Sequence, residues 1–366
     1  MARFQPTYKD AATAEKILAR IAVAPRLVTR ERIDALLVAL SRVHAERAFV
    51  LQAGPCAELF EDSEPSRVAQ MAALLGRLAA AMPGQQVVTL LRGAGQYAKP
   101  RNASHELRGG VQLPSYAGDL INRLPFREHE REPDPLNLAL AYEEAAQTIR
   151  GLAHAPHIYT SHEALHLAWE QAQLQVHDGV QYLHSAHTVW IGDKTRDLDD
   201  AHVSFAAGIA NPVGVKLGPT ATPQQAAALA LALNPHKLAG KLSLIVRLGL
   251  AHTALLDEIV IAVQQTGVPV LWLSDPMHGN TRLLPSGRKV RDLDRMTNEL
   301  VEVATCLHAR GEHLAGLHLE VSADDIAECI GEGVTEQTLH GQLACDPRLN
   351  EAQALALARA FGATSR

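Results

Sequence analysis

The sequence predicts an α/β fold, a (β/α)8 barrel, in which eight parallel strands close into a ring inside a layer of helices. From residue 48 onward, short apolar runs alternate with amphipathic runs of helical period, and this alternation implies a parallel sheet with helical crossovers. The eight units occupy about 300 residues, which suits a barrel domain. An open, doubly wound sheet is the alternative interpretation of the same alternation.

We expect an N-terminal helical extension, residues 1–47, followed by the catalytic barrel, residues 48–366. Within the extension, Tyr8–Ala22 and Arg30–Ala45 carry apolar residues at helical spacing, and Pro25 separates them. The extension is expected to pack on the barrel or on a second subunit. Its apolar stripes favour a homo-oligomer, a dimer or larger.

The expected strands are short, β-rich runs bounded by turn-forming residues. They are Ala48–Ala53, Gln86–Leu91, His157–Thr160, Thr188–Ile191, Val213–Leu217, Ser243–Val246, Val268–Leu273 and Ala315–Leu319. Helical patterns follow at Pro65–Ala81, His162–Val176, Ala201–Gly208, Pro223–Leu233, Thr253–Thr266 and Asp292–Ala309. A long insertion, Tyr97–Gly151, comes after the second strand, and insertions of this length inside a barrel are usually functional.

The residues directly after the strands share a chemical theme. Cysteine 56 follows the first strand, the cation-rich segment Arg92–Arg101 the second, and Gly192–Arg196 the fourth. The seventh strand leads to Asp275 and His278, and the eighth ends at Glu320. Because ligands of barrel enzymes bind at the carboxyl ends of the strands, this rim is the predicted active site.

Four of these side chains form a candidate metal site: Cys56, His278, Glu320 and Asp346. In the stretch L-W-L-S-D-P-M-H-G-N-T, Pro276 forbids a helix directly after the strand, so His278 lies on a tight loop. Sulfur, nitrogen and oxygen ligands together suit Mn, Fe, Co or Zn rather than Mg or Ca. Taken singly, each residue also has an ordinary structural explanation, such as a buried thiol or a helix-start carboxylate.

The rim is also rich in positive charge for a protein of net charge −6. The cations are Arg92, Lys99, Arg101, Lys194, Arg196, Lys216 and Arg247. Arg binds phosphate or carboxylate through two hydrogen bonds and Lys supplies a point charge, so this number suggests two anionic ligands. A lone Arg or Lys is usually a solvated surface charge, but Lys216 ends an apolar strand and is costly to bury without an anion.

Composition excludes several classes of partner and site. There is no polybasic block, which argues against nucleic acid or an anionic membrane as a partner. No apolar run of about 18 residues predicts a membrane span, and the N-terminus lacks a signal-peptide core. The four cysteines are sparse, which fits the cytoplasm. Neither G-x-G-x-x-G nor G-x-S-x-G occurs, so a dinucleotide fingerprint and a nucleophile elbow are absent.

The rim segments together resemble a known family. They read Q-A-G-P-C-A-E, A-G-Q-Y-A-K-P-R, L-P-S-Y-A-G-D-L-I-N, T-S-H-E-A-L, W-I-G-D-K-T-R, N-P-V-G-V-K-L-G-P-T, S-D-P-M-H-G-N-T, G-L-H-L-E-V and C-D-P-R-L-N, in order from residue 52 to residue 350. The chain is similar in these segments to type II 3-deoxy-D-arabino-heptulosonate 7-phosphate (DAHP) synthases. This resemblance covers the whole of the expected barrel.

The resemblance implies a (β/α)8 barrel that condenses phosphoenolpyruvate with erythrose 4-phosphate and releases phosphate, with a divalent metal, Mn or Co before Zn or Fe. It implies metal ligation by Cys56, His278, Glu320 and Asp346. It implies phosphoenolpyruvate binding by Arg92, Asp193, Lys194, Arg196, Lys216 and Arg247, and sugar-phosphate binding by Lys99, Arg101 and Asn102. Glu163 would lie near the reacting groups, and the catalytic residues would be Cys56, Glu163, Lys216 and His278.

The chain departs from the family pattern at three rim positions. Pro55 replaces an Asp, Lys194 an Arg and Asn102 a Ser. These changes keep open a different aldose phosphate, such as an amino-substituted one, as second substrate. A non-catalytic barrel that regulates a partner is a further alternative, and a metal-dependent hydrolase another. The short N-terminal extension resembles members that serve secondary metabolism, such as phenazine formation. Cys345, next to Asp346, is expected to form a disulfide with Cys56 in oxidised, metal-free protein.

Overall fold

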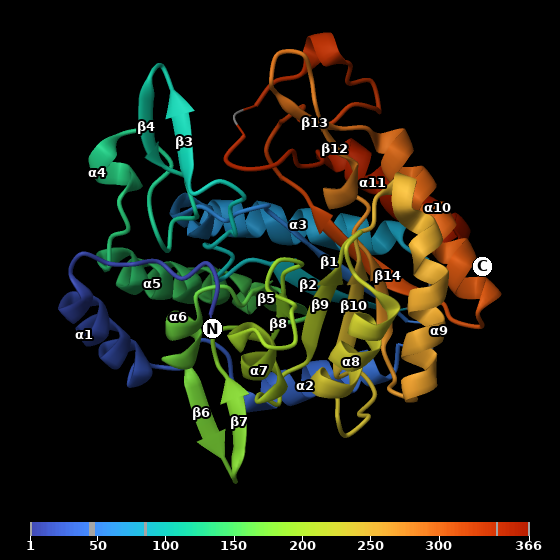
Figure 1. Ribbon diagram of the computed structural model, residues 1–366, viewed down its shortest axis with the longest axis horizontal. Coiled ribbons are helices and arrows are strands. Elements are labelled where there is room, and N and C mark those ends of the chain that lie inside the picture. Colours follow the sequence, from blue (N-terminus) through green and yellow to red (C-terminus); the bar gives the residue numbers. More distant parts are fainter. Residues whose placement is uncertain (1, 44–47, 84–85, 342, 365–366) are drawn as a thin grey trace.

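The computed structural model describes residues 2–43, 48–83, 86–341 and 343–364. At its centre lies a closed barrel with the strand order β1-β14-β11-β10-β9-β8-β5-β2 (Figure 1). Its strands are β1 (Phe49–Gly54), β2 (Val87–Arg92), β5 (Ile158–Glu163), β8 (Thr188–Ile191), β9 (Val213–Leu217), β10 (Leu242–Val246), β11 (Leu271–Ser274) and β14 (Leu314–Glu320). Neighbouring strands pair in parallel all the way round. The predicted (β/α)8 barrel is confirmed, and the open sheet is excluded.

Helices between the strands cover the outside of the barrel. They are α3 (Pro65–Ala81), α6 (Leu167–Gln171), α7 (Ala201–Ala207), α8 (Pro223–Leu233), α9 (Leu256–Thr266), α10 (Leu293–Ala309) and α11 (Glu351–Thr364). Proline is tolerated at the first position of a helix, where its missing N–H would be unpaired anyway, and α3 and α8 both begin with one. None of the helices in the described part of the chain is long and apolar enough to cross a membrane.

The helix expected at His162–Val176 is wrong. Its beginning is the end of β5, α6 is a short helix, and the chain then forms an antiparallel hairpin, β6 (Leu174–His177) and β7 (Val180–Leu183). Asp178 and Gly179 form the turn with φ of 52° and 81°. Asp-Gly is a strong signal for a two-residue hairpin turn, because both positions need positive φ.

The insertion after β2 contains a hairpin and a long helix. The hairpin pairs β3 (His105–Arg108) with β4 (Val111–Pro114), and α4 (Glu128–Arg131) and α5 (Leu136–Gly151) follow. Helix α1 (Ala11–Ala22) packs on α5 through a buried cluster that includes Ile17, Ile21 and Leu138. The first part of the N-terminal segment therefore contacts the insertion of its own chain.

Helix α2 (Arg30–Ser41) closes the amino-terminal end of the barrel. Leu36 and Leu40 are 0% and 2% exposed and share a cluster with inward-facing Val50, Leu90 and Ile245. Figure 1 shows α2 at the opposite end of the molecule from the β3–β4 and β12–β13 hairpins. Helix α2 ends at Ser41 with Arg42 as its C-cap, so the helix end expected at Ala45 is wrong. The expected domain boundary after residue 47 falls on residues 44–47, which lie outside the described residues.

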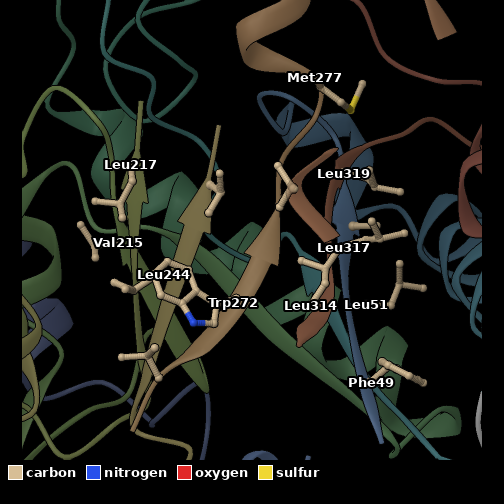
Figure 2. Close-up of a cluster of buried hydrophobic side chains, with 14 of the residues drawn as sticks. Phe49, Leu51, Val215, Leu217, Leu244, Trp272, Met277, Leu314, Leu317 and Leu319 are labelled. Carbon is tan, nitrogen blue, oxygen red and sulfur yellow. The ribbon is translucent and has the colours of Figure 1, made fainter. Parts of the chain in front are cut away.

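The outer face of the barrel carries the largest apolar core. Alternate strand residues face outward because successive side chains of a strand point to opposite sides. In β1, Phe49 and Leu51 belong to this outer layer, together with Leu244, Trp272 and Leu317 of other strands (Figure 2). The outer layer holds the helices on the barrel and leaves the other half of each strand for the interior.

Glu299 of α10 joins two loops at the carboxyl rim. Its carboxylate accepts hydrogen bonds from the Gly249 N–H at 2.8 Å and from Asn280 Nδ2 at 2.5 Å. The backbones of Gly249 and Gly279 are in close contact, since a Cβ on Gly279 would lie 2.3 Å from the Gly249 nitrogen. The loop that carries His278 is thereby tied to the loop after β10. Burial raises the pKa of Glu299 to about 7.

We expect the Leu36→Ala substitution to destabilise the protein by about 2–5 kcal/mol, because it leaves a cavity under the barrel. The exposed Val38→Ala substitution on the same helix is the matched control and should cost no more than about 0.5 kcal/mol. Urea denaturation measures both. Equal midpoints for the two variants would contradict the closure of the barrel by α2.

Glu299 should make stability fall between about pH 4.5 and pH 7. Its pKa rises from an ordinary 4.5 to about 7 on folding, so in this window the unfolded chain is ionised while the folded chain keeps its proton. The stabilisation is complete below pH 4.5 and lost above pH 7. The Glu299→Gln variant should therefore gain thermal stability relative to wild type from pH 4.5 to pH 7. The matched control is Glu302→Gln, which removes an exposed charge from α10. If the melting temperatures of Glu299→Gln and wild type differ by the same amount at every pH, this expectation is contradicted.

Candidate active site

The candidate active site lies where the inward-facing side chains become polar at the carboxyl end of the barrel. Gln52 of β1 and His318 of β14 form the boundary, joined by a 2.8 Å contact between Gln52 Oε1 and His318 Nδ1. On the other side of its ring, His318 Nε2 lies 2.5 Å from Arg92 Nη1. Burial and the nearby Lys216 and Arg92 keep the pKa of His318 well below its ordinary value. A neutral imidazole can thus accept a hydrogen bond from Arg92.

Three of the predicted metal ligands come together above this boundary. The ligand atoms of Cys56, Glu320 and Asp346 all lie within 4.8 Å of one another. His278 Nε2 lies 3.1 Å from Glu320 Oε1, so the fourth predicted ligand borders the same group. Cys56 follows β1, Glu320 ends β14, His278 begins a 3-10 turn after β11, and Asp346 lies between β14 and α11.

The donor set fits a divalent transition metal. A thiol, an imidazole and two carboxylates supply soft and hard ligands together, as Mn, Fe, Co and Zn accept. The group already attracts a cation, because Lys99 Nζ lies 2.5 Å from both Cys56 Sγ and Asp346 Oδ2. Burial opposes the charge on Lys99, but Asp346, Cys56 and Glu320 raise its pKa well above the ordinary value. Positive charge at this point is therefore strongly stabilised.

Glu320 is the most heavily paired carboxylate of the site. It is 1% exposed, and its Oε2 accepts a hydrogen bond from Arg291 Nη1 at 2.6 Å, while its Oε1 accepts one from Arg92 Nη2 at 3.2 Å. Burial alone would favour the protonated acid, but His278, Lys99 and Arg291 hold the pKa of Glu320 well below its usual range. Glu320 is therefore a charged carboxylate in the core of the site.

Asp275 orients two predicted catalytic residues. Its carboxylate contacts His278 Nδ1 at 2.7 Å and Lys216 Nζ at 3.0 Å. Burial would raise its pKa, but His278 and Lys216 hold the pKa of Asp275 well below normal. A proton on His278 Nδ1 leaves the Nε2 lone pair directed at the metal-binding group, as is usual for a histidine that ligates a metal.

Trp190 supports the predicted phosphoenolpyruvate cations. Its ring lies 5.1 Å from the Arg92 guanidinium and 5.8 Å from Lys216 Nζ, both over the ring face. The same indole belongs to the apolar cluster that α2 closes from below. Arg92 and Lys216 are buried, and burial lowers the pKa of Lys216 in spite of Asp275. An anion bound here would meet positive charge that is largely shielded from water.

The Asp193 carboxylate holds two more of the predicted phosphoenolpyruvate cations, Arg196 and Arg247. It lies 3.1 Å from Arg196 Nε and 3.0 Å from Arg247 Nη1, and it accepts the Gly218 N–H at 2.7 Å. Arg196 also donates to Thr220 Oγ1 at 2.9 Å. Asp193 is placed to hold these guanidinium groups rather than to contact an anion itself, because a carboxylate repels one.

The predicted sugar-phosphate residues lie in the insertion, next to the candidate metal ligands Cys56, Glu320 and Asp346. Arg101 lies 3.5 Å from Glu106 and 3.5 Å from Cys345 Sγ, and Asn102 Oδ1 accepts a hydrogen bond from Lys194. Burial and the positive charges of Arg247, Lys99 and Arg101 lower the pKa of Lys194 against the opposing effect of Glu163. This part of the rim therefore carries more positive charge than its own acids balance, as a site for an anion requires.

Glu163, the last residue of β5, faces the loop after β8. A Cβ on Gly192 would lie 2.1 Å from Glu163 Oε1, so only glycine allows this approach. The buried Oε1 has no hydrogen-bond partner among the described residues. The Glu163 N–H donates to Gln96 Oε1 at 2.8 Å, and Gln96 belongs to a loop whose N–H groups bind the Glu58 carboxylate. The backbone of Glu163 is thus fixed by a hydrogen bond, while its side-chain Oε1 has no partner in the part of the chain that the structure describes.

The two thiols beside the metal-binding group are neighbours. Cys56 and Cys345 share a hydrogen bond that lowers the pKa of Cys345 to about 7, while burial raises that of Cys56. All four cysteines are free. The disulfide expected for oxidised protein stays a prediction.

His318 and Arg291 are not among the site residues predicted from the sequence, and Asp275 is named on the predicted rim without a role. Asp275 and His318 lay in segments already recognised, S-D-P-M-H and G-L-H-L-E, so adjacency to a ligand was an available signal. Arg291 lies at the end of β13 (Lys289–Arg291), which pairs with β12 (Thr281–Leu283) in a hairpin after β11. No pattern marks this short hairpin, and Arg291 reaches Glu320 only through the tertiary fold.

The comparisons with known proteins agree with this arrangement. The sequence model described as "Class-II DAHP synthetase family" matches residues 1–156 and 150–362. Phospho-2-dehydro-3-deoxyheptonate aldolase of Streptomyces coelicolor is 35% identical over 422 positions, which cover 97% of this chain and 93% of the relative. The AroG protein of the same name from Mycolicibacterium smegmatis is 36% identical, with coverage of 97% and 90%. A Pseudomonas fluorescens protein named "probable phospho-2-dehydro-3-deoxyheptonate aldolase" is 36% identical over 379 positions, with coverage of 98% and 94%. The chain belongs to the class-II DAHP synthetase family and is an enzyme of that family.

Proposed function

We propose that the protein condenses phosphoenolpyruvate with erythrose 4-phosphate to give DAHP and phosphate, and that it requires a divalent metal. The observation that carries the proposal is the contact between two sets of residues at one rim. The first set is the candidate metal ligands, in which Cys56, Glu320 and Asp346 lie together. The second set is the cations expected to bind the substrate anions. Glu320 contacts both sets, because it lies next to the candidate ligand His278 and next to the cation Arg92. The names of the relatives support the same reaction.

The residues would act by binding and orienting two anions. Arg92, Lys216 and Arg247 would hold the carboxylate and phosphate of phosphoenolpyruvate, as the resemblance implies. The resemblance also implies phosphoenolpyruvate binding by Lys194, but Lys194 donates a hydrogen bond to Asn102 of the expected sugar-phosphate set, so we assign Lys194 to the phosphate of the aldehyde. A divalent metal held by Cys56, His278, Glu320 and Asp346, Mn or Co in the first instance, would polarise the aldehyde oxygen as a Lewis acid. Fixing both substrates at near-attack distance offsets their mutual repulsion and prepays the entropy of bringing them together.

The bonds change as follows. Carbon 3 of phosphoenolpyruvate forms a bond to the aldehyde carbon, and the aldehyde oxygen takes up a proton. Water adds to carbon 2 of phosphoenolpyruvate and gives up a proton, and the carbon–oxygen bond to phosphate breaks as the ketone forms. Glu163 Oε1, which is buried and without a hydrogen-bond partner within the described ranges of the chain, would accept a hydrogen bond from that water.

Three alternatives remain distinct from this proposal. The Asn102–Lys194 hydrogen bond joins two of the departures from the family pattern, Asn102 of the expected sugar-phosphate set and Lys194 of the expected phosphoenolpyruvate set, which favours a different aldose phosphate as the second candidate substrate. A non-catalytic regulatory barrel is disfavoured because the ligand group and the cations are all present in one place. A metal-dependent hydrolase would have no use for so many cations.

We also propose a cytoplasmic location, a homodimer and a role in secondary metabolism. Four free cysteines support the first. Exposed apolar residues such as Leu136 and Leu140 of α5 support the second. The third rests on the similarity to short members of the family. The alignment with the Pseudomonas relative supports it, because it spans only 379 positions for the 366 residues of this chain.

Phosphate release from phosphoenolpyruvate plus erythrose 4-phosphate tests the function. We expect release that requires both substrates, disappears with a chelator and returns with Mn²⁺ or Co²⁺. Release with an amino-substituted aldose phosphate alone would favour the second candidate substrate. No release with any aldehyde, in protein that binds metal and phosphoenolpyruvate, would contradict the enzyme proposal.

The His278→Ala variant should lose at least about 100-fold of this activity, since it removes a ligand whose orientation Asp275 fixes. His252→Ala, at an exposed histidine, is the matched control and should keep wild-type activity. Metal binding by calorimetry should weaken only in His278→Ala. Substantial turnover by His278→Ala at the same metal concentration would refute the ligand assignment.

A further inference from the structure

The chain before α1 lies across two loops of the active-site rim. We call residues Arg3–Tyr8 the N-terminal strap (Figure 1). Gln5 Nε2 donates to the Leu165 carbonyl at 2.8 Å, and the Leu167 N–H donates back to Gln5 Oε1 at 2.9 Å. Tyr8 Oη lies 3.0 Å from His166 Nε2. These contacts fix the strap on the loop that directly follows Glu163.

Arg3 joins the strap to the second loop, which follows β8. Its Nε lies 2.7 Å from Asp200 Oδ2, and its Nη2 pairs with Asp197. Asp200 is 4% exposed and accepts the His202 N–H at the start of α7, so this partner is itself held in place. The strap therefore connects the loop after β5 with the loop that carries Asp193, Lys194 and Arg196.

Phe4 stands between the two anchored residues in a strained conformation. Its φ is 58°, in the left-handed region that non-glycine residues rarely occupy. Such strain persists only where neighbouring contacts impose it, and here Arg3 and Gln5 supply them. In this conformation the Phe4 ring lies 5.8 Å from Lys194 Nζ, with the ammonium over the ring face.

Lys194 is held from two sides. The Phe4 ring is on one side, and the Asn102 side chain accepts its hydrogen bond on the other. An aromatic face attracts an ammonium without neutralising it, unlike a carboxylate. Phe4 can thus fix the position of Lys194 and leave its full charge for an anion. Asn102 belongs to the insertion and follows Arg101 in the chain, and the charges of Arg101 and Lys99 act on Lys194.

We propose that Phe4 is a positioning residue for Lys194, and that Arg3 acts through it, so that the N-terminal strap sets the affinity for the phosphate of the aldehyde substrate. This inference rests on the proposed function. It adds that residues outside the barrel, in the N-terminal strap, contribute to the binding of the aldehyde substrate. Phe4 is 37% exposed, and its ring reaches the rim only through the anchored strap.

The first test separates the two KM values. A cation–π contact at a partly exposed site corresponds to about a two- to fivefold change in binding. We expect Phe4→Ala and Arg3→Ala to raise KM for erythrose 4-phosphate by about that factor, with kcat and KM for phosphoenolpyruvate unchanged. Phe4→Trp should restore the wild-type KM. Lys9→Ala, next to the strap at an exposed residue that pairs with Glu132, is the matched control.

A double-substitution cycle assigns the effect to Lys194. In a Lys194→Ala background, Phe4→Ala should have no further effect on KM for erythrose 4-phosphate. Additive effects, no rescue by Phe4→Trp, or a fall in kcat with unchanged KM values would each overturn the proposal.

A binding measurement keeps the proposal testable if turnover fails. Inorganic phosphate, titrated by calorimetry into wild type and Phe4→Ala, should bind the variant about two- to fivefold more weakly. Equal phosphate affinities would overturn the role of Phe4. Absence of turnover in wild type, together with weaker phosphate binding by Phe4→Ala, would support the positioning role and refute only the proposed reaction.

Discussion

The buried carboxylate of Glu320 is the point on which the charges of the site depend. It contacts Arg291, Arg92 and His278 at distances of 2.6, 3.2 and 3.1 Å, with 1% of its surface exposed. A charge buried to this extent is stable only while its partners stay in place. Because Arg92 also contacts His318, and His278 also contacts Asp275, displacement of one group would change the pairing of the others. The proposed metal ligands and the proposed anion-binding cations therefore form one connected network.

The barrel provides the rigid support for this network. Its interior is apolar at the end closed by α2 and polar at the carboxyl rim, and Trp190 belongs to both layers. Residues that alternate along each strand divide between the outer core and the interior, as in β1, where Leu51 faces outward and Gln52 contacts His318. A short β-strand can therefore place a single charged residue at the rim with its backbone fully held.

The strands and the predicted ligands were accessible to sequence analysis because each depends on local pattern. Apolar runs mark the strands, and the rim residues follow them directly. The β6–β7 hairpin was missed because apolar residues from Leu167 to Val176 also fit a helical period, and the Asp178–Gly179 signal lay just beyond them. Arg291 and the strap contacts of Phe4 were out of reach, since they join residues 29 and 190 positions apart through the tertiary fold.

Crystals grown with Mn²⁺ and phosphoenolpyruvate would test the central claim, that one connected network binds both the metal and the anion. Anomalous scattering at the manganese edge locates the metal independently of any assumed ligands. The account predicts one strong peak in contact with Cys56, His278, Glu320 and Asp346, and phosphoenolpyruvate against Arg92 and Lys216 beside it. A manganese peak away from these four residues, or phosphoenolpyruvate bound without contact to Arg92 and Lys216, would contradict it.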